Sequence, residues 1–459
     1  MSQNSDTPQK REHLATRLGF LLVSAGCAIG LGNIWRFPYI TGKYGGAAFV
    51  IVYLIFLAIL GFPVMVMEFA MGRAAQLNLA GAMRTLEPKG SKWHIFGYLG
   101  ILGNVILMMF YTTVTGWGFA YLFRTLSGSF KGLPPEQVGA AFGAFLGNTW
   151  ELILWMGLVV ILGFWVCATG LQKGVEKVTK IMMVGLFALL VVMIIRSITL
   201  PGAGVGLSFY LKPDFSNLSW EGVAAAMGQA FFTLSLGIGS MTIFGSYIGK
   251  ERSLAGESIN VIILDTLVAL MAGLMIFPAC FAFGIDAGSG PGLIFVTLPN
   301  IFNQMMGGQF WGTLFFIFLI FASMTTVIAV FENIMAFTMD EWHWERKKAA
   351  IINGIGMFIL SLPCALGFGP WSGFQPRGPG SVILDLEDFI VSNNLLPIGS
   401  LVFVLFCTWK SGWGWDNFIK EADMGEGLKF PKANWARGYL TYILPFIILI
   451  LLLQGWGLF

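Results

Sequence analysis

The stretch that decides the fold is Leu18-Gly-Phe-Leu-Leu-Val-Ser-Ala-Gly26-Cys-Ala-Ile-Gly30-Leu-Gly32-Asn33-Ile-Trp-Arg36-Phe-Pro38-Tyr39. It is long and apolar enough to cross a bilayer, but glycines, an amide, a cation and a proline interrupt it. Irregular backbone at membrane depth is tolerated only where it is buried in protein or lines a cavity, and polar groups there commonly mark an ion or substrate pathway. A packing face of small residues would explain Gly26 and Gly30 but not Asn33 and Arg36. The stretch therefore predicts a broken span that lines a pathway.

The composition places the whole chain among membrane proteins. It is 56% hydrophobic and 11% charged, with a mean hydropathy of +0.76, and several apolar runs exceed the roughly 20 residues that a spanning helix needs. We expect an all-α membrane protein with eleven transmembrane helices. The expected spans are residues 16–42, 46–72, 93–126, 150–170, 175–199, 220–248, 256–284, 308–340, 346–367, 382–411 and 434–457. No small-residue cleavage site follows a short apolar core at the N-terminus, so a removable signal peptide is not expected.

The cations are divided unequally between the loops. Twenty of the 27 Lys and Arg residues fall on one side of the expected spans, and the positive-inside rule makes that side cytoplasmic. The N-terminus is then cytoplasmic, and an odd number of spans puts Phe459 outside. Because these cations are spread over loops, they indicate membrane topology and not a nucleic-acid partner. No phosphate-binding loop, dinucleotide fingerprint or ligand-spaced histidine pair occurs, so neither an enzyme nor an organic cofactor is expected.

A second interrupted span runs from Trp220 through Thr233-Leu-Ser235-Leu-Gly237-Ile-Gly239-Ser240. Two glycine-interrupted spans that lie five helices apart indicate an inverted repeat. The expected segments are a cytoplasmic N-terminal segment (1–15), a first repeat with spans one to five (16–200), a second repeat with spans six to ten (201–411), and a cytoplasmic loop with span eleven (412–459). Each break exposes amide groups that suit a carboxylate and carbonyl groups that suit a small cation. Two independent packing faces are the alternative.

Five further polar residues lie inside expected spans: Glu68, Tyr111, Asp265, Thr325 and Thr326. An unpaired carboxylate at Asp265 would be costly in an apolar run, so a cation partner is the better explanation. The threonines can instead hydrogen-bond to a carbonyl group one turn back. Tyr111 can be a packed aromatic residue whose hydroxyl bonds a neighbouring helix. Glu68 either pairs with polar groups of the broken spans or faces the interface.

Four ordered motifs carry a resemblance to a known family. They are Gly30-Leu-Gly-Asn-Ile-Trp-Arg-Phe-Pro-Tyr39, Glu68-Phe-Ala-Met-Gly-Arg73, Phe232-Thr-Leu-Ser-Leu-Gly237 and Gly290-Pro-Gly-Leu-Ile-Phe-Val-Thr-Leu-Pro299. The chain resembles the neurotransmitter:sodium symporter family over spans one to ten, and within it the bacterial branch with eleven helices. The resemblance implies a symporter of the bacterial inner membrane that binds two Na⁺ ions and a hydrophobic L-amino acid.

The resemblance also implies the ligands of both sodium ions. The first site would use oxygens of Ala28, Asn33, Thr233 and Asp265 together with the substrate carboxylate. The second would use the carbonyl groups of Gly26, Ile29 and Ala322 and the hydroxyls of Thr325 and Thr326. Both are all-oxygen sites, as a hard cation requires.

The substrate would lie between the two breaks. Its carboxylate would meet the amides of Leu31 and Gly32, the Tyr111 hydroxyl and the first sodium ion, and this shared contact would couple the two ligands. Carbonyl groups near Ala28, Phe232 and Ser235 would hold its ammonium group. The residues expected to bind the substrate are Ala28, Leu31, Gly32, Leu107, Tyr111, Phe232, Thr233, Ser235, Ile238, Val327 and Val330. Because none of them is charged, we expect an apolar substrate side chain. Ile238 and Val330 leave room where related sites can carry bulkier residues, so both branched aliphatic and aromatic side chains should fit.

Two pairs of charges would act as gates. Arg36 and Asp388 would close the outer side, and Arg11 and Asp340, with Tyr247 nearby, would close the inner side. Judged from the residues alone, Arg36 can instead extend to the outer interface, and Arg11 can be one of the cations that set the topology.

Three positions depart from the family pattern. Asp265 stands where relatives often carry Asn, and we expect its charge to replace an anion and to make transport independent of chloride. Val184 replaces a proline, so span five has less reason to unwind there. Leu14 replaces a tryptophan of the inner gate, which would make that gate thinner.

The expected function is sodium symport of hydrophobic L-amino acids by alternating access. Two alternatives stay open. One is proton-coupled transport with Asp265 as the proton carrier, and the other is a membrane receptor that binds an amino acid without uphill transport. The sequence does not indicate an oligomeric state.

Overall fold

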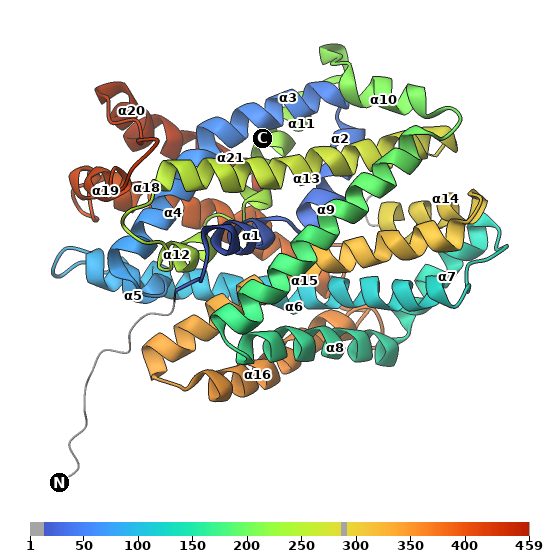
Figure 1. Cartoon of the computed structure of the whole chain (residues 1–459), viewed down its shortest axis with the longest axis horizontal. Helices are drawn as coiled ribbons and strands as arrows, with labels where there is room; N and C mark the ends of the chain where they lie inside the picture. Colours follow the sequence, from blue (N-terminus) through green and yellow to red (C-terminus); the bar gives the residue numbers. More distant parts are fainter. Residues whose placement is uncertain (1–12, 286–291, 459) are drawn as a thin grey trace, which may run out of the picture.

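The computed structural model describes residues 13–285 and 292–458. Within these ranges the chain is helical, with no strand beyond one isolated bridge between Arg252 and Glu426. Its long helices run alongside one another through one bundle (Figure 1). The predicted all-α architecture is confirmed. Arg11 and the Gly290-Pro291 start of the fourth motif lie outside the described residues.

Nine helical segments of the described chain are long and apolar enough to cross a membrane. They are α3 with α4 (Ala47–Ala75), α6 (His94–Leu126), α8 (Thr149–Ala168), α9 with the turn before it (Leu171–Ile198), α13 (Leu254–Ala282), α15 (Gly308–Trp342), α16 (Arg346–Leu366), α17 with α18 (Ile383–Thr408), and α20 with α21 (Asn434–Gly455). The shorter connecting helices are α5 (Leu79–Leu86), α7 (Pro135–Gly147), α10 (Ala203–Leu211), α14 (Leu298–Gln304) and α19 (Trp415–Ala422).

The two interrupted spans are both broken in the structure. α1 (Arg17–Ala28) and the segment Gly32–Lys43, which ends in α2 (Phe37–Lys43), form a tenth span bent by 56°. The predicted sixth span is divided into α11 (Trp220–Thr233) and α12 (Ser240–Gly245). Each of these two pieces is too short to cross a membrane alone. Ten spans are therefore recognised by length and composition in the described chain, and the count of eleven stays a prediction.

The second break depends on residues with left-handed backbone. After α11 the chain passes Ser235, Gly237 and Gly239 with φ of 52°, 97° and 75° before α12 begins. A Cβ on Gly237 would also lie 2.1 Å from the Leu396 carbonyl oxygen. Only glycine adopts such a conformation without strain and leaves room for the neighbouring backbone. The left-handed backbone and the nearby Leu396 carbonyl oxygen therefore both require glycine at position 237.

Burial separates central from peripheral spans. In the most apolar window of α15, 83% of the residues are buried, against 28% for Leu171–Ile198 and 33% for α16. α15 is therefore the most central span, and it packs against α1, α6 and α9. The broken first span, which contains α1, thus contacts the centre of the bundle. α9 (Lys177–Ile198) runs unbroken through Val184, which is 59% exposed. Span five is therefore helical at Val184 in this structure.

Candidate functional site

The two helix breaks meet at one small cavity inside the bundle. Backbone of the first break forms part of its wall, and side chains of α6, the second break, α15 and α18 (Leu396–Thr408) form the rest. The lining residues are Ala28, Gly30, Gly32, Leu107, Tyr111, Phe232, Ser235, Ile238, Thr326 and Leu396. None of these side chains is charged at neutral pH, so the cavity suits an apolar group beside polar backbone atoms.

Seven of the eleven residues predicted to bind the substrate line this cavity: Ala28, Gly32, Leu107, Tyr111, Phe232, Ser235 and Ile238. Leu31, Thr233, Val327 and Val330 are buried but are not part of the lining. Sequence reasoning misses Leu396, because no interruption or polar group marks this part of span ten.

The Tyr111 hydroxyl contacts the first break. It accepts a hydrogen bond from the Leu31 amide at 3.0 Å. A Cβ on Gly30 would lie 2.3 Å from this hydroxyl and 2.6 Å from Thr326 Oγ1. Any larger residue at Gly30 would push both hydroxyls away. The glycine is therefore required by the two side chains that it faces.

Three side chains predicted for the first sodium ion hydrogen-bond to one another. Asn33 Nδ2 donates to Asp265 Oδ1 at 2.8 Å, to the Asp265 carbonyl oxygen at 3.1 Å and to Thr233 Oγ1 at 3.2 Å. Thr233 Oγ1 donates to Asp265 Oδ2 at 2.9 Å. All three residues are almost fully buried. This polar cluster connects the first break, the second break and α13, and neutral donors solvate the Asp265 carboxylate within it.

The residues predicted for the second sodium ion meet where α1 ends against α15. Thr326 Oγ1 lies 3.3 Å from the Gly26 carbonyl oxygen and 3.1 Å from that of Ile29. Thr325 Oγ1 donates to the Ala322 carbonyl oxygen at 2.8 Å, the local bond that the sequence also allows. A Cβ on Gly26 would lie 3.2 Å from Thr325 Cβ, so the helices approach closely. The group offers oxygen ligands without a formal charge.

The predicted outer gate has an aromatic contact. The guanidinium carbon of Arg36 lies 4.3 Å from the centre of the Phe232 ring, which itself lines the cavity. Asp388 accepts a hydrogen bond from Ser392 Oγ at 2.7 Å. In the described part of the chain no ion pair within 4 Å joins Arg36 to Asp388. Arg36 therefore covers the aromatic wall of the cavity in this structure.

The predicted inner gate contains a buried carboxylate that sequence reasoning misses. Tyr247 Oη donates to Glu332 Oε1 at 3.4 Å, and Arg346 donates to the same carboxylate at 2.8 and 3.0 Å. Asp340 Oδ2 accepts hydrogen bonds from the Asn78 amide and side chain at 2.8 and 3.2 Å. Arg11, the predicted partner of Asp340, lies outside the described residues. Glu332 stands in an apolar run of span eight, which is the signal that could have revealed it.

Two further side chains support the second break. Glu68 Oε1 accepts a hydrogen bond from the Gly237 amide at 2.6 Å, so of the two alternatives for Glu68 the structure has the contact with a broken span. Asn104 donates to the Ile238 carbonyl oxygen at 2.7 Å and accepts from Ser240 Oγ at 3.0 Å. Sequence reasoning misses Asn104, although an amide inside a long apolar span is a signal that could have revealed it.

Comparisons with known proteins identify the family. The model of the sodium:neurotransmitter symporter family matches residues 11–144 and 137–457. The chain belongs to this family. This chain is 36% identical to an uncharacterised sodium-dependent transporter of Bacillus subtilis (strain 168). The match extends over 456 residues and covers 98% of this chain and 99% of the Bacillus protein. The sodium- and chloride-dependent taurine transporter of Bos taurus is 30% identical over 383 residues, 72% of the chain and 61% of that protein.

A solved structure shares the fold of this chain. The crystal structure of MhsT in complex with L-phenylalanine superposes with a TM-score of 0.86 at 40% sequence identity, and the match covers 97% of this chain and 100% of that one. This chain is therefore a sodium-dependent, multi-pass membrane transporter and not an enzyme. The family resemblance predicted from the motifs is confirmed.

Proposed function

We propose that this transporter couples sodium entry to the uptake of hydrophobic L-amino acids, aliphatic and aromatic, by alternating access. The cavity between the two breaks carries the proposal. Its apolar wall comes from Leu107, Phe232, Ile238 and Leu396, and its polar atoms come from the Tyr111 hydroxyl, Ser235, Thr326 and the first break. The L-phenylalanine in the MhsT complex is a ligand of this chemical class.

The substrate carboxylate is proposed to enter between the first break and Tyr111. The Leu31 amide donates to the Tyr111 hydroxyl at 3.0 Å, so a carboxylate oxygen that replaces this bond and lies beside both groups can accept from both, and the Gly32 amide adds a third donor. Charge-assisted bonds of this kind are stronger than the neutral bond that they replace. Val327 and Val330 remain proposed contacts of the substrate side chain.

Two sodium ions are proposed as co-substrates. Two oxygens of Asp265 and the Thr233 hydroxyl lie within 3.2 Å of the Asn33 amide nitrogen. A cation that takes the place of this nitrogen gains these oxygens, with the Asn33 side-chain oxygen, the Ala28 carbonyl group and the substrate carboxylate as further ligands. The second ion is assigned to Gly26, Ile29, Ala322, Thr325 and Thr326. Because the first ion and the substrate share a contact, each raises the affinity for the other.

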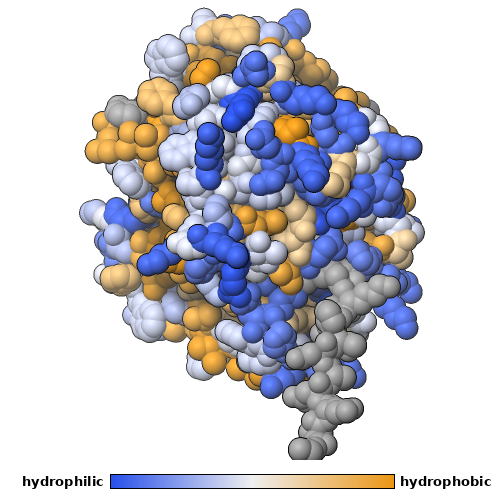
Figure 2. Space-filling model, turned by 90° about the vertical axis from the view of Figure 1, so that its left-hand side faces the viewer, coloured by the Kyte–Doolittle hydropathy of each residue, from blue (hydrophilic) through white to orange (hydrophobic). Residues whose placement is uncertain are grey.

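We further propose an N-terminus in the cytoplasm of a bacterium, with the C-terminus outside the inner membrane. The unequal distribution of loop cations supports this orientation, and Figure 2 shows hydrophilic residues gathered on the left-hand end of the bundle in Figure 1. Arg36 and Asp388 then face outward, and Asp340 and Tyr247 face inward with Arg11. The repeats 16–200 and 201–411 would carry the alternating movement.

Uptake into proteoliposomes tests the proposal. Labelled phenylalanine and leucine should accumulate under an imposed sodium gradient, and unlabelled hydrophobic amino acids should compete while lysine and glutamate should not. Accumulation driven by a pH gradient with potassium in place of sodium would instead establish proton coupling, for which the buried Asp265 is the candidate carrier. Saturable binding without accumulation would establish a receptor.

A further inference from the structure

A second cavity, of about 640 Å³, lies between the end of α18 and the start of α20 (Asn434–Gly438). α20 lies at the left-hand end of the bundle in Figure 1. The lining includes Trp409, Lys410, Asn434, Arg437, Thr441 and Tyr442, and none of the lining residues is acidic. None of them lines the transport cavity. We call this second cavity the basic pocket.

The polar groups of the basic pocket are available for a ligand. Lys410 and Arg437 are exposed, and neither forms an ion pair within 4 Å in residues 13–285 and 292–458. Thr441 Oγ1 is buried and has no hydrogen-bond partner there. Trp93 Nε1 donates to the Ser411 carbonyl oxygen at 2.7 Å and holds the chain beside Lys410 in place. The pocket therefore presents two cations and an unused hydroxyl on a fixed wall.

The basic pocket lies at the ends of two membrane-spanning segments, where the chain leaves the apolar region. One span ends at Thr408 and the next begins at Asn434. Trp409 and Tyr442 are 44% and 74% exposed, and exposed Trp and Tyr side chains are typical of the membrane–water interface. Farther along α21 (Leu444–Gly455) Phe446 is exposed and apolar. A ligand in the pocket can therefore extend acyl chains along an apolar helix face.

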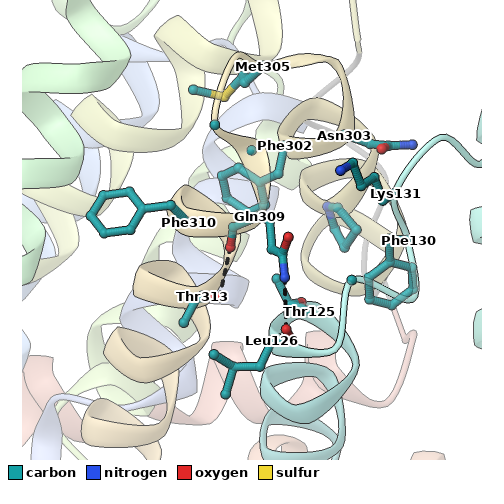
Figure 3. A pocket seen from close by; sticks show the side chains of 14 residues that line it. Thr125, Leu126, Phe130, Lys131, Phe302, Asn303, Met305, Gln309, Phe310 and Thr313 are labelled. Carbon is teal, nitrogen blue, oxygen red and sulfur yellow. Dashed lines mark hydrogen bonds between the residues drawn. The ribbon is translucent and has the colours of Figure 1, made fainter.

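A cavity of similar size at the opposite end has different chemistry. It measures about 630 Å³, and of its lining residues Lys131 alone is a cation. Figure 3 shows that two of its polar side chains bond within the protein: Gln309 Nε2 donates to the Leu126 carbonyl oxygen at 2.8 Å, and Thr313 Oγ1 donates to that of Gln309 at 2.7 Å. Both linings include a threonine hydroxyl without a hydrogen-bond partner in the described chain, Thr441 in the basic pocket and Thr125 in this cavity, so the two cations of the basic pocket distinguish it from the other cavity.

We infer that the basic pocket binds the phosphate headgroup of an anionic phospholipid from the adjoining leaflet. Lys410 and Arg437 approach the phosphate from both spans, Thr441 donates a hydrogen bond, and Trp409 and Tyr442 flank the glycerol region. Basic pockets between spans at a cation-rich face recognise anionic headgroups in this way. The bound lipid would join span eleven to span ten without entering the transport cavity.

Native mass spectrometry of the purified full chain tests this inference. Short-chain phosphatidylglycerol, phosphatidylcholine and inorganic phosphate are titrated in turn. Phosphatidylglycerol should bind at least about tenfold more tightly than phosphatidylcholine, and Lys410→Gln with Arg437→Gln should remove most of this difference, since each cation near a headgroup contributes a several-fold gain. Lys410→Arg with Arg437→Lys should retain it.

The matched control is Lys89→Gln with Lys92→Gln, which removes two exposed charges between α5 and α6 and should bind lipid as the wild type does. Equal affinity of the wild type for the two lipids would overturn the inference, as would an equal loss in both Gln pairs. Inorganic phosphate that binds as tightly as phosphatidylglycerol would point to a free anion and also overturn it. Because the wild type alone can give two of these results, the test does not depend on the folding of the variants.

Discussion

The two helix breaks use glycine for different reasons. In the first break no residue has a positive φ, and Gly30 is required because the hydroxyls of Tyr111 and Thr326 face it. In the second break Gly237 and Gly239 adopt left-handed backbone conformations. The comparison teaches that glycine makes room for side chains in one break and permits the chain path in the other.

The two polar clusters differ in a related way. The Asp265 cluster bonds to Asn33 in the first break and to Thr233 at the start of the second. Thr326 contacts carbonyl groups of the first span and the Tyr111 hydroxyl of α6. The first cluster is therefore suited to couple the two breaks, whereas the second positions the end of α1 against α15.

Gly237→Ala should have the largest effect, because it forces a side chain into left-handed backbone and against the Leu396 carbonyl oxygen. The conformational cost alone is roughly 1–2 kcal/mol, and the backbone contact adds to it. We expect a large loss of folded, monodisperse protein and a lower melting temperature. Gly228→Ala is the control, since a Cβ on Gly228 in α11 meets no atom within 4 Å. A variant at Gly237 that melts like this control would show that the second break tolerates a side chain.

Gly30→Ala should separate the two uses of glycine. The residue does not have a positive φ, so the protein should fold, but the new methyl group displaces the Tyr111 and Thr326 hydroxyls. Overpacking of about 1–3 kcal/mol should lower the melting temperature less than Gly237→Ala does. The two displaced hydroxyls no longer meet the substrate, and at about 1–1.5 kcal/mol for each hydrogen bond phenylalanine binding should weaken by roughly 100-fold. Scintillation proximity binding and thermal melting on the same samples measure both. Unchanged binding would contradict the crowding read from the structure.

Asp265→Asn tests the cluster that contacts both breaks. Hydrogen bonds to a charged group contribute about 1.5–3 kcal/mol, so loss of the carboxylate should weaken sodium-dependent uptake by roughly 30-fold in chloride-free buffer. If the Asp265 carboxylate takes the place of a bound chloride ion, wild-type uptake should be independent of chloride, and added chloride should partly restore uptake by Asp265→Asn. Asp214→Asn, at an exposed loop carboxylate, is the control for charge. Wild-type uptake that requires chloride would refute this role of Asp265.

The features that could be predicted from the sequence are polar or irregular residues inside apolar, membrane-spanning segments. Glycines, Asn33 and Asp265 are conspicuous in apolar runs because polar or irregular groups there need a partner, and the structure brings these residues together. Leu396 could not be predicted, since an apolar residue in an apolar span has no distinguishing signal. The Glu332–Arg346 pair depends on the packing of α15 against α16, which no local pattern encodes. Arg36 on Phe232 likewise reflects a tertiary contact that a charge pattern does not specify.

Thr326→Val should give the smallest of these effects, because it removes a single neutral hydroxyl, which contacts the first span and the Tyr111 hydroxyl. Loss of this oxygen leaves the carbonyl groups of Gly26 and Ile29 with one partner fewer, at about 1–1.5 kcal/mol. The sodium concentration for half-maximal uptake should rise by about tenfold, with little change in melting temperature because Val keeps the shape of Thr. Thr313→Val, whose hydroxyl bonds only within α15 in the opposite-end cavity, should leave the sodium dependence unchanged. If Thr326→Val impaired uptake as severely as Asp265→Asn, the two clusters would act as one unit and the distinction between them would fail.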